Sequence, residues 1–506
     1  MHLYDKYEPK QIMQYFETIC KIPHGPGNEA QLRQYIIDMA DKKNYVWHMD
    51  KKGNLLVFIP ATLGYENVPP ILFQGHMDMV EAKIEGSNHD FLHDPIELII
   101  EDNDIVHANG TTLGADNAVA LVNMMALIED DTFIHPPIEL LFTVEEELGL
   151  VGVRYVEYDK IKSRRMVNMD AGDHETMCVS CAGAISAQII LPIKRIPISS
   201  NQYMISVSGL TGGHGGIGIV FNRASAIKLM GCIIYRLKEN VQFNLLSICR
   251  PELRSIATEL ECILAFPENE FQKVETIINE AFGEFKLEYA HTDPNMMVTL
   301  QQYEVSTGSM LDDASSNAIA DLMYLMPYGV IKRSNQEYDY VLCSNNIDGV
   351  VLENERFVAY NMIRSPFDAY KWELFREMKL HARLCGAEIV ITDEFTGWPY
   401  TGDKPLHIIS KKVFRKLFGF DIKISKENGC AEPCIIAGKL PNMEIIGMSP
   451  YSRGAHTTDE HMNVATFLPF WMFVKALLLE MCLEEDKSCN YEDLRNADTC
   501  NTVETA

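Results

Sequence analysis

Four segments within the first 170 residues place a histidine or a carboxylate directly after an apolar, strand-like run or in a tight turn. They hold His76 with Asp78, Asp116, the acidic triplet 145–147, and Asp170. Open α/β sheets bind ligands at the carboxyl ends of their strands. Zinc accepts both imidazole nitrogen and carboxylate oxygen. The recurrence therefore predicts a metal site at one edge of an α/β sheet.

Strand-like and helix-like runs alternate through the same part of the chain. Helical patterns cover 31–43 and 118–127, and apolar runs read as strands at 54–59, 71–73, 138–144 and 166–169. This alternation predicts an α/β layer architecture. From about residue 187 the strands become longer and more alternating, which indicates an inserted α+β domain. We expect segments 1–186 and 395–506 to form one domain, 187–394 the insertion, and 484–506 a polar tail.

Composition argues against several classes of partner. The chain has 71 acidic and 44 basic residues and a net charge of -27, which disfavours nucleic acid or an anionic membrane as a partner. The first ten residues lack a secretory pattern, so we expect a cytoplasmic protein. The apolar stretch 467–483 is interrupted by Pro469, Lys475 and Glu480, and we expect a buried helix there.

The spacing of the acidic and imidazole groups indicates which of them can bind metal and which can orient a ligand. His76 and Asp78 are two apart in an extended run, so both can face one site, with Asp78 orienting the imidazole. A late histidine is needed to complete a two-metal site, and the segment RGAHTTDEHMNV offers His456 or His461. No H-E-x-x-H helix is present, so a thermolysin-like site with one zinc ion is unsupported.

The motifs GHMDMV, GTTLGADN, FTVEEELG and NMD occur in this order. Together they resemble the aminoacylase and carboxypeptidase clan of co-catalytic di-zinc peptidases, and in particular its aminoacyl-histidine dipeptidase (peptidase D, carnosinase-like) branch. The likeness extends to about residue 480. It implies a catalytic domain with a mixed sheet and an inserted α+β lid domain.

The resemblance also implies a role for each matching residue. Glu146, the first glutamate of the E-E-x-G pattern, is expected to be the general base, and Asp78 to hold His76. Asp116 is expected to bridge two zinc ions, which manganese or cobalt can replace, and to precede a cis bond to Asn117. The implied metal ligands are His76, Asp116, Glu147, Asp170 and His456.

Two further residues and a dimer follow from the same resemblance. His214, in the lid loop GLTGGHGGIGI, is expected to polarise the scissile carbonyl, and Glu432 to bind the free amino group of the substrate. The lid of such enzymes often joins two subunits, so a homodimer is expected. Asn428 stands where this branch often has histidine, which leaves the substrate preference open.

The implied activity is metal-dependent hydrolysis of dipeptides in the cytosol, for Xaa-His or a broader range. The attacking water is activated by two zinc ions, with Glu146 as the base. One alternative is an N-acyl amino acid amidohydrolase that uses the same metal site. Another is a non-catalytic peptide-binding homologue, which would be expected to have lost the base or ligands, and every one of those positions is filled.

Overall fold

The computed structural model describes residues 2–303 and 308–485, which form two compact units. The first unit holds 2–179, 400–425 and 431–485, and the second holds 180–303, 308–399 and 426–430. The boundaries expected after residues 186 and 394 differ from this division by a few residues. Strands β9 (Gly183–Pro192) and β21 (Glu388–Phe395) belong entirely to the second unit. The expected tail lies outside the described residues from 486 onwards.

The first unit is built on a mixed sheet of eight strands, which confirms the expected α/β fold. Its three central strands run parallel and are almost fully buried, as strands covered on both faces are. In spatial order the strands are β1 (Val46–Met49), β2 (Leu55–Ile59), β6 (Ile138–Thr143), β3 (Ile71–His76), β7 (Arg165–Asn168), β23 (Glu444–Gly447), β8 (Thr176–Cys178) and β22 (Lys423–Ser425).

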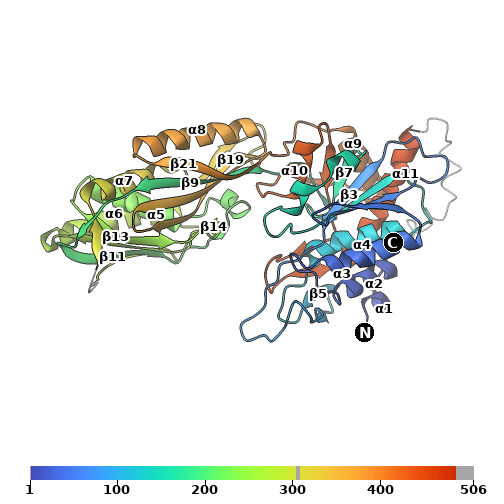
Figure 1. Cartoon of the computed structure of the whole chain (residues 1–506), viewed down its shortest axis with the longest axis horizontal. Helices are drawn as coiled ribbons and strands as arrows, with labels where there is room; N and C mark the ends of the chain where they lie inside the picture. The colour runs from blue at the N-terminus through green and yellow to red at the C-terminus, as the bar shows by residue number, and fades with distance from the viewer. Residues whose placement is uncertain (1, 304–307, 486–506) are drawn as a thin grey trace. The chain divides into compact units, whose positions relative to one another are not determined.

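Helices from both ends of the chain pack around this sheet (Figure 1). They are α1 (Leu3–Lys6), α2 (Lys10–Ile19), α3 (Ala30–Lys42), α4 (Ala115–Glu129), α9 (Pro405–Phe418), α10 (Glu432–Lys439) and α11 (Phe467–Glu485). Helix α4 packs on β3, and α9 packs on β23. Nearly every residue of α4 is buried, because it lies between the sheet and its neighbours α2 and α3.

Helix α11 contains the most apolar stretch of the chain. The segment Val464–Glu484 is long and apolar enough to span a membrane, and it is the one such helix among the described residues. Its side chains Phe467, Phe470, Phe473 and Leu477 are buried within the core of the first unit. The expected buried helix is therefore confirmed.

A second, smaller sheet joins distant parts of the first unit. Its strands are β24 (Ser452–Arg453), β25 (His461–Asn463), β5 (Ile105–Ala108) and β4 (Leu98–Ile100). All the pairs are antiparallel, and His461 lies opposite His107. This sheet fixes the loop 454–460, which follows β24, close to the segment that precedes α4.

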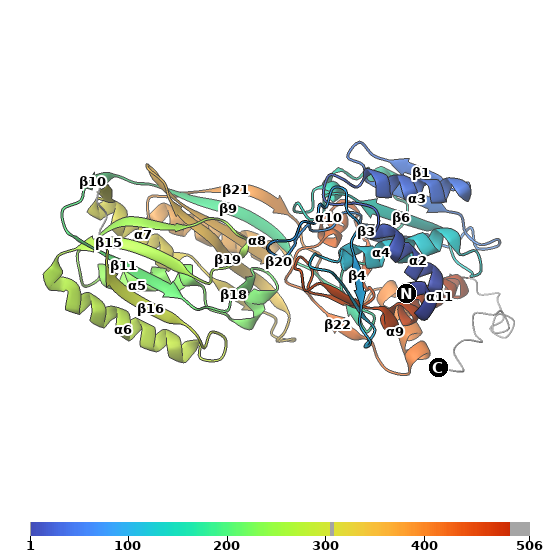
Figure 2. The ribbon, with the colours of Figure 1, turned by 90° about the horizontal axis from the view of Figure 1, so that it is seen from below.

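The second unit is an α+β structure around a nine-stranded sheet. Eight strands follow the order β16 (Met297–Gln302), β11 (Asn201–Ser208), β15 (Leu260–Phe266), β13 (Asn244–Arg250), β19 (Val341–Leu352), β20 (Arg356–Ser365), β9 and β21, and β18 (Gly329–Arg333) pairs with β19. Figure 2 shows the helices of this unit, which are α5 (Ala226–Lys238), α6 (Phe271–Glu288), α7 (Asp313–Leu325) and α8 (Asp368–Leu384). Their apolar faces and the sheet share one core, as the expected inserted domain requires.

His407 gives the first unit a pH-sensitive contact away from the strand ends. Its Nδ1 accepts the backbone N–H of Lys404 at 3.1 Å, and its Nε2 donates to the carbonyl of Ile445 at 3.0 Å. The bond from Lys404 needs an unprotonated Nδ1, so it is lost when the ring is protonated. Burial lowers the pKa of His407 below its ordinary value, so the folded state resists protonation.

Acidification is therefore expected to destabilise the fold through His407. The stabilisation is complete above the unfolded-state pKa of about 6.5 and is lost as pH falls from that value towards the lower pKa of the folded state. Between about pH 7.5 and 5.5 the free energy of unfolding should fall more in the wild type than in His407→Gln, by up to about 1.4 kcal/mol per pH unit. Glutamine can make both bonds without titrating. Urea unfolding of both proteins at the two pH values measures the difference, and equal losses would contradict the assignment.

Candidate metal and active site

The parallel register of three strands brings the predicted groups to one edge of the sheet. Strand β3 pairs with β6, so that His76 lies opposite Thr143, and with β7, so that Gln74 lies opposite Asn168. The residues after these strands therefore leave the sheet side by side. The acidic triplet 145–147 follows β6, and Asp170 follows β7.

Asp116 reaches this edge from the beginning of α4. A side-chain carbon at Gly75 would lie 2.5 Å from Oδ1 of Asn117 and 2.6 Å from the Cβ of Ala120, so only glycine lets the helix approach β3 this closely. Asp116 has non-helical torsion angles, and the bond between Asp116 and Asn117 is cis, as the resemblance implied. The amide of Asn117 donates to Oδ1 of Asp170 at 3.0 Å and so ties the two acidic residues together.

Two histidines approach Asp116 from opposite sides. Nε2 of His76 lies 3.0 Å from Oδ1 of Asp116 and 3.7 Å from Oδ1 of Asp170. Nε2 of His456 lies 3.5 Å from Oδ2 of Asp116 and 2.9 Å from Oε2 of Glu147. The five side chains thus form two groups of three that share Asp116.

The two candidate late histidines have different surroundings. His456 adopts a left-handed backbone conformation, with φ of 67°, and its ring faces Glu147 and Asp116. His461 lies in strand β25, and its Nδ1 contacts the backbone carbonyl of Asp459 at 2.9 Å. The structure therefore brings His456 to the other predicted groups, and His461 makes no contact with them among the described residues.

Asp78 connects the histidine to the glutamate turn. Nδ1 of His76 bonds to the backbone carbonyl of Asp78 at 2.8 Å, whereas the carboxylate lies 3.6 Å away. The two carboxylate oxygens instead accept the backbone N–H groups of Glu146 and Glu147, each at 3.0 Å. Asp78 thus holds the imidazole with its backbone and the glutamate turn with its side chain, and the second contact was not foreseen from the sequence.

The carboxylates of the neighbouring residues Glu145 and Glu146 have different contacts. Glu145 forms an ion pair with Lys52 at 2.6 Å. The carboxylate of Glu146 receives no hydrogen bond from any described residue. Burial raises the pKa of Glu146 well above its ordinary value, His76 opposes this, and the charges of Asp170 and Glu147 add to it.

The electrostatics of the cluster favour a cation. Burial alone would lower the pKa of His76, but the neighbouring carboxylates of Asp116, Asp170 and Asp78 raise it well above its usual value. Burial raises the pKa of Glu147, and Oε1 of this residue is buried with no hydrogen-bond partner among the described residues. Buried carboxylates need a positive partner or hydrogen bonds.

The donor set also fits a metal ion. One ligand atom each from His76, Asp116 and Glu147 lies within 4.8 Å of the others, so the two groups of three are themselves close together. Among the described residues this is the one place where three or more histidine, cysteine or acidic side chains gather so closely. Imidazole nitrogen and carboxylate oxygen suit zinc and related divalent ions. The residues present therefore form a candidate metal site.

Glu432 lies beneath this edge of the sheet, at the first position of α10. It is fully buried, and its Oε2 accepts hydrogen bonds from the side chains of Gln74 and Thr143. Oε1 has no hydrogen-bond partner among the described residues. Burial raises the pKa of Glu432 to about 8. One carboxylate oxygen is thus available to a donor that the chain itself does not supply.

His214 and Asn428 belong to the second unit. Nδ1 of His214 accepts the backbone N–H groups of Gly216 and Ile217 at 3.3 and 3.0 Å, which places the ring proton on Nε2 when the ring is neutral. The amide of Asn428 donates to the carbonyl of Gly216 at 3.0 Å and to Ser344 Oγ at 2.9 Å. Asn428 therefore supports the loop that carries His214.

Arg364 of the same unit has a buried, incompletely hydrogen-bonded guanidinium that no sequence motif predicted. Its side chain is 3% exposed, and both Nε and Nη1 are buried without a hydrogen-bond partner in the described residues. Cβ at Gly216 would lie 2.9 Å from Nε, so glycine is needed beside it. A buried guanidinium with unpaired N–H groups is suited to a carboxylate.

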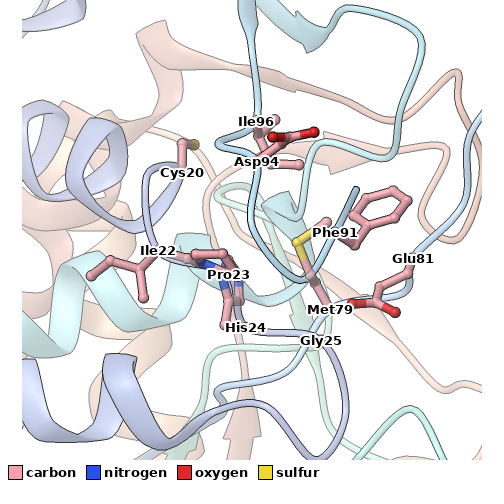
Figure 3. Close-up of a pocket in the computed structure, with 10 residues that line it drawn as sticks. All are labelled: Cys20, Ile22, Pro23, His24, Gly25, Met79, Glu81, Phe91, Asp94 and Ile96. Atoms are coloured by element: carbon pink, nitrogen blue, oxygen red, sulfur yellow. The ribbon is translucent and has the colours of Figure 1, made fainter. Parts of the chain in front are cut away.

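A pocket of the first unit lies next to the residues that follow β3. Figure 3 shows its lining, in which His24, Met79 and Glu81 come from two separate loops. Its volume of about 10 Å³ suits one water molecule and is too small for a peptide. This pocket is therefore not a substrate site.

Comparisons with known proteins identify the family of the chain. Residues 72–480 match the model of peptidase family M20/M25/M40. The chain is 27% identical over 476 residues to the cytosol non-specific dipeptidase of Escherichia coli (strain K12), covering 94% of this chain and 98% of that protein.

Solved structures show the same similarity. The aminoacylhistidine dipeptidase of Vibrio alginolyticus matches with a TM-score of 0.84 and 27% identity, over 94% of this chain and 98% of that one. Aminopeptidase PepT of Bacillus cereus shares the fold, with a TM-score of 0.58 and 15% identity, over 94% of this chain and 99% of its own. Because the family model spans most of the sequence, the chain belongs to peptidase family M20/M25/M40 and is a hydrolase of peptide bonds.

Proposed function

We propose that this protein is a cytosolic, metal-dependent dipeptidase that holds two zinc ions. The arrangement of two histidines about Asp116, each within 3.5 Å of a different carboxylate oxygen, is the observation that carries the proposal. The names of the Escherichia coli and Vibrio relatives support a dipeptide substrate. The first of those names also supports a cytosolic location.

The two groups of three suggest how the ions are held. His76, Asp116 and Asp170 would hold one ion, and His456, Asp116 and Glu147 the other, with Asp116 common to both. Zinc suits the donors, and manganese or cobalt can replace it in sites of this kind. When bound, such ions acidify a water molecule and polarise the carbonyl of the substrate.

Glu146 is the residue placed to move protons. Its carboxylate makes no hydrogen bond with the described residues, so its oxygens are available to accept a proton. Glu146 takes a proton from the attacking water and returns it to the leaving amine. Asp78 fixes the backbone of Glu146, and so its direction, through the bond to its N–H.

A buried polar group of the first unit matches one charged end of a dipeptide. Oε1 of Glu432 has no hydrogen-bond partner among the described residues and is available for the free amino group of the substrate. His214, with its proton on Nε2, is a candidate donor to the scissile carbonyl. One such donor often contributes about 10²- to 10³-fold to the rate.

Glu432 also separates this proposal from the acyl amino acid alternative. An N-acyl substrate has no ammonium group, so a buried carboxylate oxygen would remain unpaired in its complex, and unpaired buried groups cost binding energy. A non-catalytic homologue would need no base, yet Glu146 and the five proposed ligands are all in place. Binding of a homodimer partner through the second unit follows from the resemblance alone.

A substrate panel is expected to distinguish these activities. The purified, zinc-loaded chain should release amino acids from unblocked dipeptides, including carnosine, at least about 10²-fold faster than from N-acetyl amino acids, because only the former carry the ammonium group. Chromatography of the products measures the initial rates. Faster hydrolysis of N-acetyl amino acids would favour the amidohydrolase, and comparable rates on several dipeptides would show that histidine is not required.

A further inference from the structure

Glu460 is a buried carboxylate that lies next to the proposed metal site without belonging to it. It follows the loop that carries His456 and is 2% exposed. Its Oε2 accepts the backbone N–H groups of Leu113 at 2.7 Å and Gly114 at 2.9 Å. Its Oε1 accepts the N–H of Asp116 at 2.9 Å. Both oxygens are therefore directed at the turn that begins α4.

This turn needs an acceptor from elsewhere in the chain. The first N–H groups of a helix have no partner within the helix, and Gly114 at the cap provides no side chain. Gly114 also has a left-handed conformation, with φ of 73°, which helps several N–H groups point the same way. A carboxylate suits these donors because the beginning of a helix carries partial positive charge.

The same residue closes the loop that carries the late histidine. The N–H of Glu460 donates to the carbonyl of Thr457 at 3.2 Å, and the N–H of Thr457 donates to that of Gly454 at 3.2 Å. A side-chain carbon at Gly454 would lie 2.8 Å from the carbonyl oxygen of Asp459, so the loop is compact. His456 lies inside this loop, four residues before Glu460.

We propose that Glu460 is a positioning residue that sets the separation of Asp116 and His456 and thereby tunes metal affinity. It joins two ligand-bearing segments that lie more than 340 residues apart in the sequence. Its oxygens are occupied by N–H groups, so it acts through Asp116 and His456 rather than on the metal. This inference rests on the proposed metal site of the peptidase.

The test compares Glu460→Gln with Glu139→Gln. Glu139 is also buried, and its two carboxylate oxygens accept the N–H groups of Lys162 and Ser163, each at 3.0 Å. Both variants lose one charged acceptor of backbone N–H groups, so both are expected to melt at a lower temperature. Only the first should change the metal site.

Metal affinity is measured by competition for Zn²⁺ between the full-length protein and a chromogenic chelator. The geometry of the metal ligands is followed by the absorption spectrum of the Co²⁺-loaded protein. Glu460→Gln is expected to raise the dissociation constant about 10- to 100-fold, as loss of an outer partner of a ligand does, and to change the Co²⁺ spectrum. The dissociation constant of Glu139→Gln should stay within about twofold of the wild-type value, because its partners Lys162 and Ser163 are not metal ligands. Wild-type affinity and spectrum in Glu460→Gln would overturn the proposal.

The wild-type protein provides a second test, which holds even if Glu460→Gln does not fold. Because coupling between two equilibria is reciprocal, Zn²⁺ should slow hydrogen exchange of the Leu113, Gly114 and Asp116 amides. Exchange that Zn²⁺ leaves unchanged would overturn the role of Glu460. A wild-type protein that binds no divalent metal would instead contradict the proposed function. If the wild type binds metal but has no peptidase activity, metal affinity and hydrogen exchange still test the role of Glu460.

Discussion

Glu146→Gln is expected to lower kcat by about 10²- to 10⁴-fold while about two zinc ions per chain remain bound. The amide has nearly the same size as the carboxylate but cannot accept a proton at neutral pH. The proposed ligands Glu147 and Asp116 are unchanged, and the N–H of residue 146 can still bond to Asp78. Steady-state kinetics with an unblocked dipeptide and metal analysis of the same sample measure both quantities.

Glu145→Gln is the matched control for this result. It changes the neighbouring carboxylate and removes only the ion pair with Lys52. Exposed or half-exposed ion pairs contribute little, about 0–1 kcal/mol, so this variant should keep near-normal kcat and metal content. Near-normal kcat in Glu146→Gln, or equal losses in both variants, would remove Glu146 from the role of base.

Asp116→Asn is expected to lose metal as well as activity. Its carboxylate faces His76 on one side and His456 on the other, so the substitution removes a negative charge from both groups of three. Because loss of an outer partner already lowers metal affinity about 10- to 100-fold, loss of this shared ligand should exceed about 100-fold. Zinc content after dialysis and the rate at saturating Zn²⁺ test the expectation.

The two late histidines provide the control for the metal site. His456→Gln should lose zinc, because the imidazole faces Glu147 and Asp116. His461→Gln should keep zinc and turnover, because that ring contacts the backbone of Asp459. The opposite pattern, with zinc retained in the first variant and lost in the second, would reverse the choice of ligand.

The sequence predicted those parts of the site that depend on regular structure. Buried parallel strands appear as short apolar runs, and the residues that follow them must emerge at one edge of the sheet. His76, the acidic triplet 145–147 and Asp170 could be placed together for that reason, and the resemblance selected Glu147 from the triplet. The motif order added Asp116 and favoured His456 over His461. The mixed sheet and the inserted α+β domain followed from the same patterns and from the resemblance.

Contacts between side chains and distant backbone could not be predicted. Asp78 accepts N–H groups 68 and 69 residues away, and Glu460 accepts N–H groups more than 340 residues away. Such bonds leave no periodicity in the sequence, because any loop carboxylate can make them. Arg364 was missed because its burial and unpaired nitrogens depend on the packing around Gly216.

The division of the chain was predicted only approximately for a similar reason. The short segment 426–430 belongs to the second unit, although its flanking residues belong to the first. Asn428 explains this placement, because its amide bonds to Gly216 and Ser344 within the second unit. A five-residue excursion of this kind changes neither composition nor hydrophobic pattern.

Zinc titration of the chelated protein tests the central claim most directly. The metal-free chain is mixed with increasing Zn²⁺, and the hydrolysis of an unblocked dipeptide is followed together with bound metal. The rate is expected to be negligible without metal and to reach its maximum at about two ions per chain, as a two-metal site requires. Full activity of the metal-free protein, or no hydrolysis at any zinc content, would contradict a metal-dependent dipeptidase.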